Sequence, residues 1–217
     1  MPCANPAATV LTAFRRGTIL ILLGTPMIAK GLDFPNVTLV GVIDADTVLH
    51  QPDLRASERT FQLIAQVAGR TGRGPRGGRV LVQTMCPDEP VIRSAAMHDY
   101  LGFAQRELQQ RRELSLPPFC SLARVILRGR SEANVQADAR RLAGLVRDAA
   151  TETDAAVRIA GPAPAPLIKL KGLYRHHFRL QAEQPQEIQN LWRSIAGQMR
   201  PSTGVQLVID VDPLDLR

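Results

Sequence analysis

Three short apolar runs in the first half of the chain restrict its fold more than any other feature. They are TILILLG at 18–24, VTLVGVID at 37–44 and RVLVQT at 79–84. None of them alternates strictly between polar and apolar residues, and Gly, Pro or Asn residues flank them. Short continuous runs are typical of strands that are buried on both faces, as in a parallel sheet covered by helices. The runs therefore predict an α/β domain.

A helix is predicted between the second and third runs. Apolar residues recur at helical spacing from Phe61 to Ala68, Ser57 stands where an N-terminal cap is expected, and Gly69 follows the last apolar residue. A strand, a helix and a strand in succession are the wiring of a parallel α/β sheet.

Two more helices are expected before the double proline at 117–118, one beginning near Asp88 and a charged one over 103–114 that the prolines stop. After the prolines, alternating and amphipathic segments follow in the order β-α-β-β-α-β, at 121–129, 131–150, 157–170, 173–183, 185–198 and 205–212. That order is typical of a ferredoxin-like split βαβ domain. We therefore expect two domains, residues 1–105 and 106–217.

The charge balance favours a polyanionic partner. The 217 residues carry a formal net charge of +7, and the pI is about 10.1. Residues 1–105 hold 10 basic and 8 acidic side chains, whereas residues 106–217 hold 17 and 12, so the excess lies mainly in the second half. A basic surface attracts nucleic acid, although solvated arginines are an equally ordinary explanation.

Cysteine usage and hydropathy exclude several classes of protein. Cys3, Cys86 and Cys120 are far apart and form no C-x-x-C pair, which argues against a disulfide framework and against a zinc site. No run of about 18 apolar residues occurs, and the first residues lack the pattern of an export signal. We expect a cytoplasmic protein with reduced thiols, no membrane contact and no metal site in this chain.

The stretch LLGTPMIAKGLDFP, at 22–35, has the composition of a phosphate-binding loop but not its order. A Walker A loop reads Gly-x4-Gly-Lys-Ser/Thr, whereas Lys30 here precedes Gly31 and Leu32 follows. A second glycine-rich stretch, QVAGRTGRG at 66–74, has the form Q-x-x-G-R-x-G-R. Read alone, the first is a strand-to-helix turn with a solvated lysine, and the second is a turn with two surface arginines.

Together and in this order, the two stretches resemble motifs V and VI of superfamily 2 helicases. The intervening DADTVLHQPDLRASERTF, the LPPF junction, the GPAPAP turn and the terminal DVDP resemble the PriA family of replication-restart helicases in particular. The resemblance covers the chain from about Leu11 onward. It implies part of the second RecA-like motor lobe, with a parallel sheet, followed by the family's C-terminal domain.

The resemblance also implies roles for individual residues. In motif VI, Arg73 is the expected arginine finger, Arg70 lies beside it, and Gln66 positions the nucleotide or the attacking water. Gly31, Asp33 and Gly69 are expected at the nucleotide, and Thr25 and Lys30 at the DNA phosphates. An arginine suits a transferring phosphoryl group because its planar fork donates two parallel bonds and stays charged. Pro26 departs from the family, which usually has glutamine there.

A basic strand in the second half is a further candidate for DNA binding. In LYRHHFRLQ, Arg175, His177 and Arg179 share one face, and Lys169 and Lys171 lie just upstream. This set can track single-stranded DNA, and the family's C-terminal domain is implicated in contacts with DNA and with single-stranded-DNA-binding protein. The more common meaning of such a pattern is a solvated outer face of a sheet.

The resemblance implies a whole protein that uses ATP and Mg²⁺, translocates 3′→5′ on DNA, restarts stalled forks and loads primosome proteins. Its first lobe, with Walker A and Walker B, and its zinc-binding cysteine segment precede the region that resembles this chain. We therefore expect this chain alone to be inactive. The alternative is a truncated, non-catalytic module that binds single-stranded DNA or a partner. A stand-alone nucleotide-binding enzyme is disfavoured because no G-x-G-x-x-G follows a strand.

Overall fold

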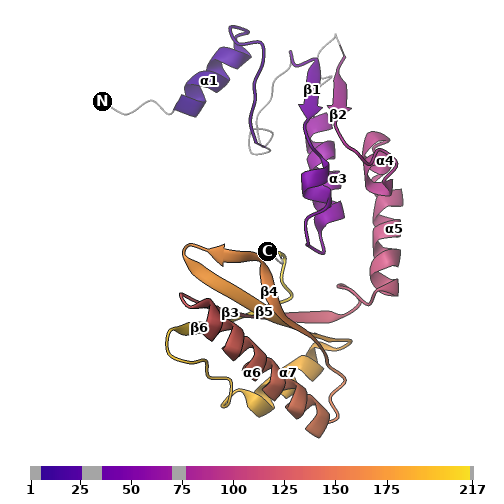
Figure 1. Ribbon diagram of the computed structural model, residues 1–217. Helices are drawn as coiled ribbons and strands as arrows, with labels where there is room; N and C mark the ends of the chain where they lie inside the picture. The colour runs from indigo at the N-terminus through magenta and orange to yellow at the C-terminus, as the bar shows by residue number, and fades with distance from the viewer. Residues whose placement is uncertain (1–5, 26–35, 70–76, 216–217) are drawn as a thin grey trace. The chain divides into compact units, whose positions relative to one another are not determined.

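The computed structural model describes residues 6–25, 36–69 and 77–215, and these form two compact units. The first comprises residues 1–51 and 56–104, and the second comprises residues 52–55 and 105–217. Figure 1 shows both units and labels most of their elements. In the described part of the chain, none of the helices is long and apolar enough to span a membrane.

The first unit is built around two parallel strands. In chain order its elements are α1 (Pro6–Arg15), β1 (Leu39–Val42), α2 (Asp46–Leu49), α3 (Ala56–Ala68), β2 (Arg79–Val82), α4 (Pro90–Ala96) and the start of α5 (Tyr100–Glu113). β1 pairs with β2 in parallel, from Leu39 opposite Arg79 to Val42 opposite Val82. The predicted strands at 37–44 and 79–84 are therefore confirmed, as is the helix between them. α3 begins at Ala56, so Ser57 lies in its first turn and not at the cap position.

The strand predicted at 18–24 is wrong. Those residues form no strand, and the side chains of Leu20, Ile21 and Leu23 are exposed. A strand needs ladder partners for its backbone groups, and among the described residues β1 and β2 pair only with each other. An apolar run such as 18–24 indicates that a segment is suited to burial, but it does not indicate whether a neighbouring strand is present to pair with it.

The described residues cover the two-stranded sheet on one face only, which corrects the expectation of burial on both faces. Val40, Val42, Val80 and Val82 face a core supplied largely by α3 and α4, while Leu39 and Leu81 on the other face are 57% and 60% exposed. In this core Phe61 of α3 stacks on Phe103 of α5, with ring centroids 4.6 Å apart. The stack fixes the start of α5 against α3.

The second unit is a four-stranded antiparallel sheet with two helices on one face (Figure 1). After the end of α5 its elements are β3 (Ser121–Gly129), α6 (Glu132–Glu152), β4 (Arg158–Leu170), β5 (Leu173–Ala182), α7 (Pro185–Ile195) and β6 (Val205–Val211). The predicted order β-α-β-β-α-β is confirmed, and the strands lie in the order β4-β5-β3-β6. α6 and α7 pack on the sheet around fully buried Val125, Leu142 and Phe178.

Local chemistry sets the ends of these elements. The hydroxyl of Ser131 accepts a hydrogen bond from the Asn134 amide and caps α6. The capping box of Gln184 and Glu187 begins α7. Lys171 and Gly172, with φ of 50° and 81°, form the tight turn between β4 and β5, where positive φ at both positions matches the strand twist.

A buried carboxylate ties α6 to the approach to β6. Asp138 accepts hydrogen bonds from the Ser202 amide at 2.7 Å, the Ser202 hydroxyl at 3.0 Å and the Arg141 guanidinium at 2.9 Å. Burial alone raises the pKa of Asp138, but the hydrogen bonds from Ser202 and Arg141 outweigh it and hold the pKa below its usual value. The ionised carboxylate therefore stabilises the folded unit.

Candidate functional site

Two of the residues predicted in motif VI, Gln66 and Gly69, lie in the described part of the chain, at the end of α3. Gln66 is exposed in the last turn, and the exposed Gly69 donates its amide to the Ala65 carbonyl at 3.0 Å. A Cβ added at Gly69 would meet only ordinary contacts, and its φ is not positive, so the backbone there does not require glycine. Arg70 and Arg73 lie outside the described residues, which leaves their roles as predictions.

Motif V is described only at its first edge. Thr25 is exposed and irregular in conformation. The other candidates of this motif, Lys30, Gly31 and Asp33, lie outside the described residues, as does Pro26. The predicted DNA-binding and nucleotide-binding roles in this motif therefore stay predictions.

The loops that follow β1 and β2 meet at the carboxyl edge of the two strands. The Ala45 amide donates to the Gln83 carbonyl at 3.0 Å. The carboxylate of Asp46 accepts from the Thr84 hydroxyl at 2.5 Å and from the Met85 amide at 2.7 Å. The Thr84 hydrogen bond, and then the Met85 amide, lower the pKa of Asp46. Sequence analysis assigned Asp46 no role, although its place after a buried run was a usable signal.

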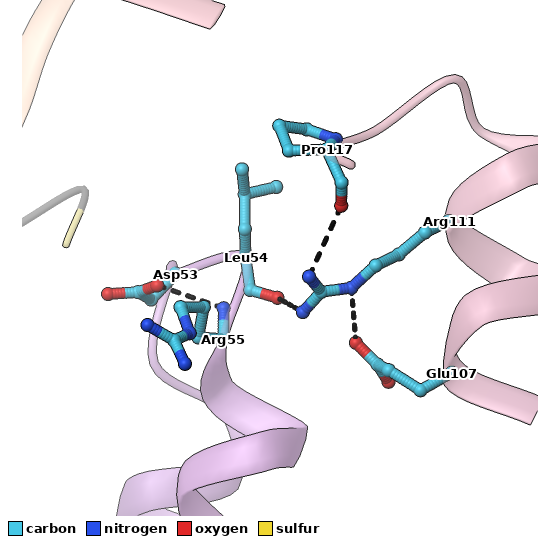
Figure 2. A network of polar contacts seen from close by, with 6 residues as sticks. All are labelled: Asp53, Leu54, Arg55, Glu107, Arg111 and Pro117. Atoms are coloured by element: carbon cyan, nitrogen blue, oxygen red, sulfur yellow. Dashed lines mark hydrogen bonds and ion pairs between the residues drawn. The ribbon is translucent and has the colours of Figure 1, made fainter. Parts of the chain in front are cut away.

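A second polar network holds the segment that leads into α3 (Figure 2). The guanidinium of Arg111 on α5 donates to the Leu54 carbonyl at 3.0 Å and to the Pro117 carbonyl at 3.2 Å, and it pairs with Glu107 at 2.8 Å. The side chains of Arg111 and Glu107 are only 12% and 14% exposed. The guanidinium of Arg111 thus binds three acceptors within the second unit, and one of them, the Leu54 carbonyl, belongs to the segment 52–55.

Sequence analysis missed Arg111 because it stands in a charged run next to Arg112. The two arginines do different things. Arg112 lies over the ring of Phe119, with its guanidinium carbon 4.6 Å from the ring centroid. In the sequence, the one feature that distinguishes Arg111 from Arg112 is its spacing of four residues from Glu107, which places both side chains on the same face of the helix.

The basic sheet face of the second unit is less exposed than expected. Arg175 is 8% exposed, and Arg179 and His177 are half-buried. Beside them lies Arg124 of β3, which is 1% exposed and donates from Nε to Nδ1 of His177 at 2.8 Å. Although the sequence of β3 alternates, the strand is buried on both faces from Leu122 to Leu127.

Burial and mutual repulsion shape the charges on this face. Burial, followed by the neighbouring Arg124, Arg179 and Arg175, lowers the pKa of His177 to about 4. Burial also lowers the pKa of Arg124, with Arg175 adding to the effect, while Asp210 and Asp215 oppose it. His177 is therefore the neutral acceptor for Arg124 at neutral pH.

The two predicted lysines lie at the exposed turn between β4 and β5. Lys169 holds its ammonium 4.5 Å from the centroid of the Tyr174 ring, and Lys171 occupies the turn itself. Both are accessible to a phosphate backbone. Of the four basic residues predicted to bind DNA in this half, these two are the exposed ones.

Comparison with known proteins gives two family matches. Residues 6–75 match the helicase conserved C-terminal domain, and residues 112–214 match the primosomal protein N C-terminal domain. The first match places the chain among proteins that carry a helicase C-terminal domain.

Individual relatives narrow the class to one family. Replication restart protein PriA of Bacillus subtilis is 40% identical over 94% of this chain, that of Synechocystis is 39% identical over 95%, and that of Treponema pallidum is 40% identical over 94%. The chain belongs to the PriA family. It covers 25%, 24% and 30% of the lengths of these three relatives.

Among solved structures, a de novo designed protein, Foldit4, covers 43% of the chain with a TM-score of 0.33 and 15% identity. This likeness carries no argument about the fold or the function.

Proposed function

We propose that this chain is part of an ATP-dependent 3′→5′ DNA helicase that restarts stalled replication forks and assembles the primosome. The observation that carries the proposal is the coverage of nearly the whole chain by replication restart proteins PriA at about 40% identity. Two family matches on one chain, a helicase domain followed by a primosomal domain, support it.

In this proposal residues 1–105 form part of the second RecA-like lobe, and residues 106–217 form the C-terminal domain. The parallel pairing of β1 with β2, with α3 connecting them, supports a RecA-like lobe. The antiparallel order β4-β5-β3-β6 with both helices on one face supports a ferredoxin-like fold for the second domain.

We propose that Arg73 and Arg70 complete a triphosphate pocket, with Gln66 at the nucleotide or the attacking water. Gly31, Asp33 and Gly69 contribute backbone and carboxylate contacts to the same cleft. The bound ATP and Mg²⁺, which the first lobe of the whole protein holds, supply the phosphoryl group and part of the charge neutralisation. The guanidinium groups stabilise the negative charge that develops on transfer, and Thr25 and Lys30 hold DNA phosphates without reading bases.

Because a Walker A loop is required for this chemistry, the isolated chain should hydrolyse no ATP above background, with or without single-stranded DNA. A phosphate-release assay on the purified chain tests this. A DNA-stimulated rate that Arg73→Ala abolishes would show that the chain needs no first lobe, and the proposed division of labour would be wrong.

A second candidate, a non-catalytic module that binds single-stranded DNA or a partner such as single-stranded-DNA-binding protein, is favoured by one observation. Lys169 and Lys171 lie exposed on a unit that has its own core and most of the net charge. Fluorescence anisotropy with a labelled oligonucleotide at several salt concentrations tests it. Phosphate binding predicts a falling affinity with salt and a shallower slope in the double variant Lys169→Ala, Lys171→Ala. A flat response would exclude it.

A further inference from the structure

Three side chains of metal-binding type meet at the carboxyl edge of β1 and β2. Asp46 begins α2, His50 stands at the C-cap of the same helix, and Cys86 follows β2. One possible ligand atom from each lies within 4.8 Å of the other two. The three belong to the first unit, and none of them is used by the proposed helicase chemistry.

The local structure positions these groups in advance. Asp46 and His50 are four residues apart, which places them on the same side of one helical turn. The hydroxyl of Thr84 donates to Asp46 at 2.5 Å and accepts from the Cys86 amide at 3.0 Å, so one side chain connects the carboxylate to the loop that carries the thiol. Such outer contacts orient metal ligands and are a regular part of metal sites.

The site is open to an ion from solvent. Asp46 and Cys86 are half-buried, and the imidazole of His50 is exposed. Ligands around one tetrahedral zinc ion lie about 3.5 Å apart, given bond lengths of about 2.0–2.3 Å. An ion bound between the three groups would draw them together from the 4.8 Å limit, chiefly by rotation of the exposed His50 side chain.

We propose that Asp46, His50 and Cys86 bind one Zn²⁺ ion, with water as the fourth ligand. A carboxylate oxygen, an imidazole nitrogen and a thiolate sulfur are the donors that Zn²⁺ accepts, whereas Mg²⁺ and Ca²⁺ require oxygen. Binding deprotonates the Cys86 thiol and releases the proton to solvent. The ion joins the loop after β1 to the loop after β2 and so stabilises the edge of the two-stranded sheet.

The fold, and not the spacing along the chain, brings the three ligands together. Cys86 belongs to a different loop from Asp46 and His50, and it forms no C-x-x-C pair. For this reason sequence analysis predicted no metal site. The proposal does not depend on the helicase function, because it rests only on side chains of the first unit.

Titration with Co²⁺, a spectroscopic substitute for Zn²⁺, tests the site directly. The protein for this experiment is prepared without a histidine tag, which would itself bind Co²⁺. The substitutions Cys3→Ser and Cys120→Ser leave Cys86 as its one thiol. We expect one equivalent of Co²⁺ to give a sulfur-to-cobalt charge-transfer band that Zn²⁺ removes by displacement. Lowering the pH should weaken binding, because metal ligands bind the ion in their deprotonated form.

Two variants and a control decide the outcome. Cys86→Ser should abolish the charge-transfer band, and His50→Ala should weaken Co²⁺ binding at least tenfold. His98→Ala changes another exposed histidine of the same unit and should leave binding unchanged. His50 is exposed, so its removal does not endanger the fold, and circular dichroism checks this. Absence of the band, or binding that His50→Ala leaves undiminished, overturns the proposal.

Discussion

The two units of this chain differ in how completely their sheets are buried. The second unit covers one face of four paired strands with α6 and α7, and it encloses Phe178, Val125 and Leu142 completely. The first unit has two paired strands, and the described residues leave Leu39, Leu81 and Met85 at the surface. The difference teaches that an apolar strand sequence alone does not make a closed layer, because closure also needs neighbouring strands.

The largest effect is expected from emptying the core of the second unit. Phe178→Ala should lower the free energy of unfolding by about 3–5 kcal/mol, because it leaves a cavity among α6, α7 and the sheet. Trp192 is the one tryptophan of the chain and packs against this core, so its fluorescence in a urea titration reports on this unit. A decrease of less than about 1 kcal/mol in the free energy of unfolding would show that the core around Phe178 is not tightly packed.

The next effect concerns the buried carboxylate of the same unit. Asp138→Ala should lower the free energy of unfolding by about 2–4 kcal/mol. The substitution removes the carboxylate that accepts hydrogen bonds from Ser202 and Arg141, so these donors lose their acceptor. Since folding lowers the pKa of Asp138, its contribution is complete above the unfolded value of about 3.9 and is lost as the pH falls through the folded value.

Urea titrations of the parent and the Asp138→Ala variant, at neutral pH and near pH 3, measure this contribution. The gap between the two proteins should narrow at the lower pH. A gap that stays constant would indicate that the carboxylate charge is not responsible.

A smaller effect is expected at His177. Its folded pKa of about 4 lies below the usual value of about 6.5, so the unfolded chain binds the proton more readily. The stability contributed by the neutral imidazole is therefore complete above about pH 6.5 and falls between that value and about pH 4. After discounting for solvent screening, the loss is roughly 1–2 kcal/mol. His177→Phe should flatten this part of the pH profile of unfolding, and an unchanged profile would exclude His177 as its source.

The smallest effect is expected on the open face of the first unit. Leu81→Thr should change the free energy of unfolding by less than about 0.5 kcal/mol, because the side chain is 60% exposed and threonine keeps the preference for a strand. Hydrogen exchange of the β1 and β2 amides measures the local effect. A loss comparable to that of Phe178→Ala would show that Leu81 is covered in solution, and the contrast between the units would disappear.

Local patterns predicted much of the fold. The helical spacing that begins at Phe61 gave α3, and the succession after Pro118 gave every element of the second unit in order. The failures arise where the outcome depends on distant partners. The run at 18–24 looks like the run at 37–44, but among the described residues only the latter has a ladder partner. Arg175 was expected on a basic outer face of the sheet, but the tertiary fold buries it.

The candidate site was predictable to a smaller extent. The helical pattern predicted that Gln66 and Gly69 lie at the end of a helix, and they lie at the end of α3. Their roles at the nucleotide stay predictions. The contacts of Arg111 with Leu54 and of Asp46 with Thr84 join residues far apart in the chain, and no local pattern encodes such pairs. The sequence shows which chemistry is available, but the fold decides which groups meet.

We propose above that Arg73 of this chain supplies the arginine finger of a replication-restart helicase. The direct test replaces the matching quarter of Bacillus subtilis PriA with this chain and measures DNA-stimulated ATP hydrolysis. We predict that the chimera hydrolyses ATP, that Arg73→Ala lowers the rate by about 10³-fold or more, and that the control Arg93→Ala, at an exposed arginine of α4, leaves it unchanged. A chimera without activity, or one whose activity survives Arg73→Ala, would contradict the account.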